Sequence, residues 1–190
     1  MNEHLARALA KIDEIHADDP TRTSDGRARE TIYAERMTHW LERVDPAASE
    51  ALRVAVRAQH LARWRLPRDA YPEGRVGYLA WRKDAREKHA ADVRAIVLDV
   101  GYDDVFAARV ASLVMKKDRS RDAEAQSLED CACLVFLELD YGDFVSKYDD
   151  AKVIDVVKKT WAKMSARARD EASTLALEGR PARLVRDAIS

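Results

Sequence analysis

The spacing of apolar residues constrains the fold of this chain more than any other feature of its sequence. Leu5, Leu9, Ile12 and Ile15 form one stripe in which apolar side chains recur every three or four positions. That spacing is the period of one face of an α-helix, and it returns in one segment after another. No alternating apolar and polar pattern, which is typical of β-strands, persists in the sequence. The sequence therefore predicts an all-α protein folded as a helical bundle.

Breaks between the stripes divide the chain into its expected helices. Residues 18–28 and 66–74 carry proline and glycine, so we expect loops there. The chain has 190 residues and no low-complexity linker, so we expect one domain over residues 1–170. Residues 171–190 are expected to be a C-terminal extension, folded as a helix that packs on this domain. The expected helices include residues 53–64, residues 76–100, the apolar segment 128–139 and residues 152–164.

Composition and cysteine use favour a cytoplasmic protein. The formal net charge is −1, and no segment approaches the roughly 18 apolar residues that span a membrane. The first residues include acidic side chains, unlike a signal peptide. Cys131 and Cys133 lie two positions apart in an apolar segment, so on a helix they point in different directions and cannot pair. We expect both to be reduced core residues, and we expect no membrane partner.

The balanced net charge conceals an uneven distribution of charge along the chain. Residues 53–94 carry eleven Lys and Arg against five Asp and Glu. Residues 118–155 carry eleven Asp and Glu against four Lys and Arg. If the two segments face each other, they form a polar cleft that offers charges of both signs. The alternative is an ordinary solvated surface with mixed charges.

Polar residues occupy several positions where the helical spacing calls for an apolar side chain. His60 and His89 lie on the apolar faces of their predicted helices, and Asp130 begins the apolar segment 128–139. Glu35 borders the apolar stripe of an earlier helix. Imidazole and carboxylate groups that converge in a helical bundle are ligands for Zn, Mn or Fe. We therefore expect His60, His89 and Asp130 to bind a divalent metal, with Glu35 as a further candidate.

Two explanations without a metal remain open for these residues. A lone histidine on an apolar face is more often a core residue with one hydrogen-bond partner than a ligand. A buried carboxylate is also tolerated when a cation neutralises it. In that case Arg57, Arg63 or Lys117 would pair with Asp130 and its neighbour Glu129.

Arginine and aromatic side chains gather around the two histidines in the sequence. At such density arginine suits bidentate recognition of phosphate or carboxylate, and interleaved aromatic rings can stack on a planar ligand. The alternative is that the aromatic residues pack the core beneath the arginine stems. The candidate substrate-binding residues are Arg57, Arg63, Arg82, Lys117, Trp64 and Tyr78.

Common catalytic motifs are missing from the sequence. There is no G-x-S-x-G, no glycine-rich phosphate loop and no H-E-x-x-H. Acyl transfer and P-loop chemistry are therefore not expected.

Several long motifs, in order, resemble the family called domain of unknown function 4202. They cover roughly residues 5–170, and the family has no established activity to carry over. The motifs are IYAERMTHWL, PAASEALRVAVRAQHLARWRLPRDAYPEGRVGYLAWR, HAADV, GYDDV, AQSLEDCACLVFLE and KTWAKMS.

The order of polar residues also resembles that of HD-domain hydrolases, which are all-α proteins with a His, a His-Asp pair and a later Asp as metal ligands. The resemblance implies that Glu35 stands near the first ligand, Gln59-His60 near the pair, His89 for an additional histidine and Asp130 for the last Asp. The chain departs from that pattern because Leu61 follows His60, so the His-Asp doublet is missing. Lys116-Lys117 stands where related proteins place histidines, and it could hold a phosphate.

Two functional hypotheses follow from the sequence. The first is a metal-assisted hydrolase that acts on a phosphorylated or other anionic small molecule, with His60, Asp130 and Glu35 as catalytic residues. An iron-dependent oxidase is a variant of this hypothesis. The second is a binding module that presents the basic segment 63–86 to RNA or an acidic partner.

Overall fold

A computed structural model describes residues 2–117 and 120–189, and it confirms the predicted all-α class. The described residues contain no β-strand. The helices are α1 (Glu3–Ala17), α2 (Arg29–Val44), α3 (Glu50–Arg57), α4 (Gly74–Asp99), α5 (Asp104–Val114), α6 (Ala123–Val135), α7 (Tyr141–Lys147), α8 (Asp150–Trp161), α9 (Ala166–Ala172) and α10 (Gly179–Ile189). None of these described helices is long and apolar enough to cross a membrane.

Short polar side chains start most of the helices. Such a side chain accepts a hydrogen bond from one of the free backbone N–H groups in the first helical turn. Ser49 caps α3 in this way, Asp103 caps α5, and Asp149 caps α8. Gly101 follows α4 with a φ of 103°, the left-handed conformation that glycine adopts without strain. The predicted end of the long helix is therefore confirmed.

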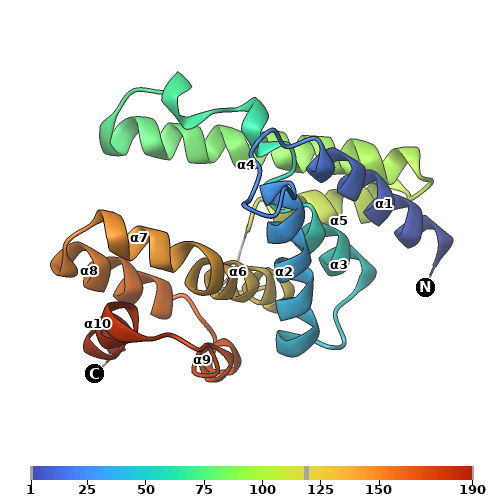
Figure 1. Cartoon of the computed structure of the whole chain (residues 1–190). Helices are drawn as coiled ribbons and strands as arrows, with labels where there is room; N and C mark the ends of the chain where they lie inside the picture. The colour runs from blue at the N-terminus through green and yellow to red at the C-terminus, as the bar shows by residue number, and fades with distance from the viewer. Residues whose placement is uncertain (1, 118–119, 190) are drawn as a thin grey trace.

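The core lies where α2, α3, α5 and α6 meet (Figure 1), and α1 packs against α2, α3 and α4. Met37, Leu52, Leu113 and Leu134 are fully buried there. Both cysteines are also buried free thiols on α6, as expected. The C-terminal helix α10 packs on α8 and on α7.

Residues 63–86, which we call the arm, project beyond this core above α6, α7 and α8 (Figure 1). The arm comprises two short 3-10 turns and the first half of α4. Trp81 Nε1 donates a hydrogen bond to the carbonyl of Leu66 at 2.9 Å. A Cβ atom on Gly77 would lie 1.9 Å from the Pro72 carbonyl oxygen, so only glycine lets the loop lie this close to α4. The arm is thus held together by its own contacts.

The predicted helix over residues 53–64 is wrong at its end, because α3 stops at Arg57. Histidine side chains bind the carbonyl groups that a continuing helix would have used. His16 Nε2 lies 2.9 Å from the Arg57 carbonyl, and His89 Nδ1 lies 2.7 Å from the Leu61 carbonyl. Because a carbonyl only accepts, each imidazole donates. These bonds stabilise an irregular turn that carries His60 towards the arm.

Candidate functional site

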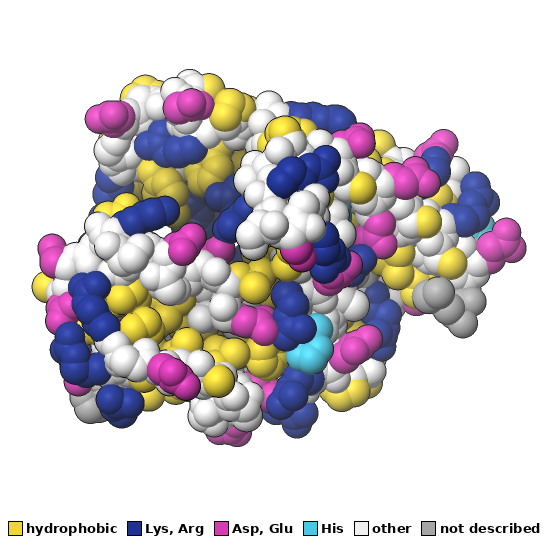
Figure 2. Space-filling view, in the orientation of Figure 1, with side chains coloured by type: hydrophobic (Ala, Val, Ile, Leu, Met, Phe, Trp, Pro, Cys, Tyr) yellow, Lys and Arg dark blue, Asp and Glu magenta, His cyan; other side chains and the backbone are white. Residues whose placement is uncertain are grey.

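A pocket of about 320 Å³ lies between the arm and helices α6 and α8. Figure 2 shows it as a hollow with an apolar floor and with Lys and Arg side chains around it. Residues of the basic segment 53–94 and of the acidic segment 118–155 both line it, which is the first of the two alternatives for these segments. Residues 118–119 of the acidic segment lie outside the described residues. The volume falls within the range of small-molecule sites, which is roughly 300–1,000 Å³.

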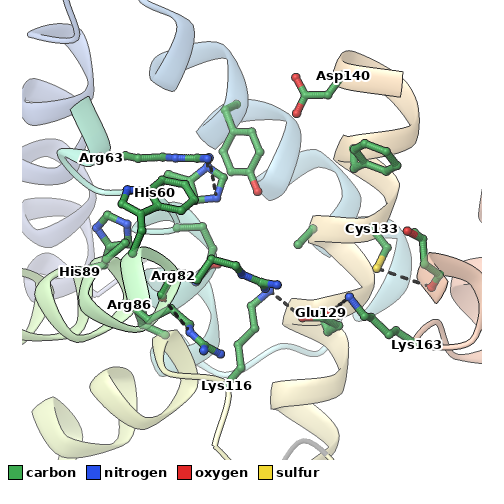
Figure 3. A pocket seen from close by; sticks show the side chains of 18 of the residues that line it. His60, Arg63, Arg82, Arg86, His89, Lys116, Glu129, Cys133, Asp140 and Lys163 are labelled. Atoms are coloured by element: carbon green, nitrogen blue, oxygen red, sulfur yellow. Dashed lines mark hydrogen bonds and ion pairs between the residues drawn. The ribbon is translucent and has the colours of Figure 1, made fainter. Parts of the chain in front are cut away.

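Five cationic side chains line this pocket. Arg63, Arg82 and Arg86 come from the arm, Lys116 follows α5, and Lys163 follows α8. Figure 3 shows Arg82, Arg86 and Lys116 extending into the same space. Within residues 2–117 and 120–189, no carboxylate forms a salt bridge with the three arginines. Their guanidinium groups are therefore available to an anion that enters.

Two carboxylates balance part of this charge. Glu129 Oε2 lies 2.7 Å from Lys116 Nζ, and Glu129 Oε1 lies 3.7 Å from Lys163 Nζ. Asp140 pairs with Arg29 at the edge of the pocket. Five cationic and two anionic side chains thus line the pocket, and its charge is positive although the whole chain is nearly neutral.

Apolar and aromatic side chains form the rest of the wall. Ala132, Cys133 and Phe136 line it from the α6 side, and Tyr78 and Trp81 line it from the arm. The guanidinium carbon of Arg63 lies 4.9 Å from the Trp81 ring centre. This cation–π contact holds one arginine over an aromatic ring without a carboxylate partner.

Irregular backbone conformations surround the pocket. Among the described residues other than glycine, His60, Ala62 and Lys116 alone have positive φ, with values of 63°, 52° and 54°. Such conformations cost about 1–2 kcal/mol for a residue with a Cβ atom and are found often at functional sites. Lys116 takes the position after α5 that glycine usually fills, and its ammonium group reaches the pocket.

A π-helical turn is a further irregularity beside the pocket. It spans Phe136–Asp140, between α6 and α7, and both of its end residues line the pocket. Glu138 within this turn accepts hydrogen bonds from Arg36 and from Trp40 Nε1, at 2.6–2.9 Å. These bonds tie the π-helical turn to α2. Such turns are rare and occur often at functional sites.

His60 is the pocket residue with the most unusual surroundings. Its ring stacks on Tyr33 with ring centres 4.3 Å apart, and Arg63 Nη1 lies 3.2 and 3.3 Å from its two nitrogens. Nδ1 also lies 3.7 Å from Oε2 of Glu30. Burial, followed by the positive charge of Arg63, lowers the pKa of His60 well below its ordinary value. The ring is therefore neutral near pH 7.

His89 lies beside His60, with ring centres 6.3 Å apart. Its Nδ1 is committed to the Leu61 carbonyl, and burial lowers its pKa to about 3. His89 is thus a neutral structural histidine that positions the turn carrying His60.

The three predicted metal ligands are not brought together. Asp130 accepts hydrogen bonds from Gln126 Nε2 and from the backbone N–H of Ser165, both at 2.8 Å, so it anchors the start of α9 to α6. In the part of the chain that the structure describes, no group of three His, Cys, Asp or Glu side chains could hold a metal ion. The pocket also has a surplus of cationic side chains, which disfavours a divalent cation. We therefore derive no metal-dependent step.

Some of the other predicted site residues line the pocket, and the rest lie elsewhere in the protein. Arg63, Arg82 and Tyr78 line the pocket. The carboxylate of Glu35 pairs with Arg27 at 2.6 Å on an exposed surface, and Arg57 Nε binds Asp13 at 2.6 Å. Trp64 and Lys117 also lie outside the pocket lining.

Sequence reasoning missed several pocket residues. It chose Lys117 and Asp130 as site residues, whereas their neighbours Lys116 and Glu129 face the pocket. Lys116 was named only together with Lys117, and Glu129 only as a possible ion-pair partner. The left-handed backbone at Lys116 turns its side chain away from the expected helical face. Lys163 gave no signal within the predicted helix 152–164. Glu30, which lies close to His60 but does not line the pocket, resembles an ordinary acidic residue in a first helical turn.

Fold and site together define an all-α protein with a basic pocket between an arm and a helical core. Residues 6–185 match the family described as Domain of unknown function (DUF4202), and the chain belongs to this family. No curated protein matches the chain. No solved structure matches it either, so the relationship to HD-domain hydrolases stays a prediction.

Proposed function

We propose that this protein binds a phosphorylated small molecule in the basic pocket and hydrolyses its phosphate ester. The observation that carries the proposal is the set of three arm arginines that face the pocket without a carboxylate partner among the described residues. Two lysines from the opposite side add positive charge. An anion held between them would bridge the arm and the helical core.

A phosphate group suits this arrangement better than a single carboxylate. Guanidinium groups form paired hydrogen bonds with phosphate oxygens, and lysine adds a point charge. A phosphate monoester carries close to two negative charges and three terminal oxygens, so it can use several cations at once. The apolar surface of Ala132, Cys133 and Phe136 would then contact the rest of the molecule.

His60 supports a hydrolytic reaction, because a neutral imidazole is a general base. In the proposed step one nitrogen of His60 takes a proton from a water molecule, and the water oxygen bonds to phosphorus. The ester P–O bond breaks, and its electron pair remains on the leaving oxygen. That oxygen takes the proton from His60, so the products are an alcohol and phosphate, and the ring is neutral again.

Arg63 is suited to couple binding with this chemistry. It is the residue whose guanidinium group contacts the nitrogens of His60. A bound phosphate would compete for that group and free the nitrogen that has to accept a proton. The cations that remain would stabilise the charge on the transferring group.

Release of inorganic phosphate from a panel of phosphate monoesters tests this function. We expect turnover by the purified protein and a loss of about 10²–10⁴-fold in rate for His60→Gln, with ligand binding retained. His39→Gln is the matched control, because it makes the same substitution at a histidine of α2 that does not line the pocket. Equal turnover by the wild type and His60→Gln would contradict the proposal.

The RNA-binding hypothesis has less support from the arm. Three of its arginines face the pocket, and Arg68 donates to the backbone carbonyls of Tyr71 and Pro72, each at 3.0 Å. These four arginines are therefore not presented together on an outer surface that a nucleic acid could follow. The exposed basic residues of the arm outside the pocket lining are only Arg65, Arg75 and Lys83.

A further inference from the structure

We infer that Glu30 is a positioning residue that selects the protonated nitrogen of His60 and so determines whether His60 can act as a base. The inference rests on the proposed function, and it concerns a residue that does not line the pocket. Glu30 lies in the first turn of α2, with one carboxyl oxygen close to His60.

The carboxyl group of Glu30 is buried and incompletely bonded. Its side chain is 11% exposed, and Oε2 has no hydrogen-bond partner among the described residues. The backbone N–H of Glu30 donates to Asp19 Oδ2 at 3.0 Å, which fixes this end of the helix. A buried carboxylate oxygen without a partner is costly, so its retention requires an explanation.

The nearest titratable nitrogen is Nδ1 of His60, 3.7 Å from Oε2. This separation is slightly longer than a hydrogen bond, and a small rotation of either side chain would close it. Tyr33 stacks on one face of the His60 ring, so the edge that carries Nδ1 is not covered by this contact. Among the described histidines, lysines and arginines, His60 alone has a nitrogen within 4 Å of a Glu30 carboxylate oxygen. His16, which also acts electrostatically on Glu30, lies farther away.

Glu30 is also able to change its charge near neutral pH. Burial raises its pKa from 4.5 to about 7, against the opposing effect of nearby positive charge. The charged and titratable groups that act on it are Arg63, His16, Asp19 and Arg29, and His60 faces it at the distance given above. Arg63 is the largest of the effects that favour the ionised form.

Each charge state of Glu30 favours one tautomer of His60. An ionised Glu30 only accepts, so Nδ1 carries the proton and donates it, and Nε2 keeps a free electron pair. A protonated Glu30 donates to Nδ1, so Nε2 carries the proton and cannot act as a base towards the pocket. His60 therefore gains its basic nitrogen as the pH rises through about 7.

Side-chain ¹⁵N NMR of histidine-labelled protein tests this inference without a substrate. The chain has five histidines, and the His60→Gln spectrum identifies the His60 signals by their loss. We expect the wild-type protein to show Nδ1 protonated at pH 8, with the two nitrogen signals of His60 exchanging positions as the pH falls below 7. In Glu30→Gln we expect no such transition, and in the control Glu35→Gln, which changes an exposed carboxylate of the same helix, we expect it to remain.

A His60 tautomer that stays constant between pH 6 and pH 8 in the wild type would overturn the inference, and this measurement needs no variant to fold. Persistence of the transition in folded Glu30→Gln would also overturn it. Failure of the proposed function gives a different result, because the pocket would then bind no phosphate while the tautomer transition remained.

Discussion

Oε2 of Glu30 lies 3.7 Å from Nδ1 of His60, and Glu30 itself does not line the basic pocket. A buried carboxyl group thus adjoins the imidazole of His60. Figure 3 shows that this imidazole lies beside Arg63 in the pocket lining. His89 stabilises the turn that carries His60, because it donates a hydrogen bond to the Leu61 carbonyl. Stability, binding and the proposed catalysis therefore depend on separate contacts that can be tested one at a time.

The first prediction concerns stability and pH at Glu30. Its pKa is higher in the folded protein, about 7, than the ordinary 4.5, so the folded state binds more protons between these values. Stability therefore falls as the pH rises from 4.5 to 7, by about 3 kcal/mol at roughly 1.4 kcal/mol per unit. Glu30→Gln removes this loss, and urea unfolding at several pH values measures the difference from the wild type.

Buried histidines make the free energy of unfolding change with pH in the opposite direction to Glu30. The wild type therefore has to be compared with Glu30→Gln. His16, His60 and His89 have lowered pKa values in the folded protein, so stability falls as the pH drops below 6.5. The wild type alone shows the sum of both effects. A constant difference between the wild type and Glu30→Gln across this pH range would contradict the first prediction.

The second prediction concerns anion binding by the arm. Arg82→Ala and Arg86→Ala should each weaken phosphate binding by about 10- to 150-fold, because each removes a charge-assisted hydrogen bond worth about 1.5–3 kcal/mol. Arg75→Ala is the matched control, since Arg75 is an exposed arginine on the same helix outside the pocket lining. Isothermal titration calorimetry measures the affinities, and equal weakening by all three variants would count against a specific site.

The third prediction distinguishes two roles for Asp130: a residue that stabilises the fold, or a metal ligand. Asp130→Ala should lower the free energy of unfolding by about 3 kcal/mol, because Gln126 and the Ser165 N–H lose their buried acceptor. Phosphate affinity and metal content should not change. Loss of a stoichiometric metal on this substitution would instead support the metal site expected from the sequence.

The fourth prediction concerns the shape of the arm. Gly77→Ala should lower the free energy of unfolding by about 2 kcal/mol and weaken phosphate binding, since the new methyl group would collide with the Pro72 carbonyl. Gly142→Ala is the control, because a Cβ there meets nothing within 4 Å and the residue lies in α7. It should raise stability by about 1 kcal/mol. Thermal unfolding measures both, and equal effects would contradict the prediction.

The helical fold could be predicted from the sequence because the apolar spacing directly reflects which face of each helix is buried. Leu5 and Ile12 of the first stripe are buried, as that spacing requires. The same rule failed after Arg57, where His16 and His89, distant in sequence, bind the backbone carbonyls. A local pattern contains no information about such long-range donors.

The site could be predicted only in outline. Clustered arginines indicated an anion site, and Arg63 and Arg82 do line the pocket. Helical spacing nevertheless selected Asp130, which faces the start of α9, instead of its neighbour Glu129. Glu30 was missed because acidic residues are common in first helical turns for electrostatic reasons. Its importance depends on its burial beside His60, which only the folded structure shows.

Titration of ¹⁵N-labelled protein with inorganic phosphate, followed by backbone amide NMR, tests the central claim most directly. We predict saturable shifts concentrated at the arm and at the residues around Lys116 and Glu129, and a weaker response in Arg82→Ala. The absence of saturable shifts, or shifts concentrated on a surface away from the pocket, would contradict the claim that this pocket binds a phosphate group.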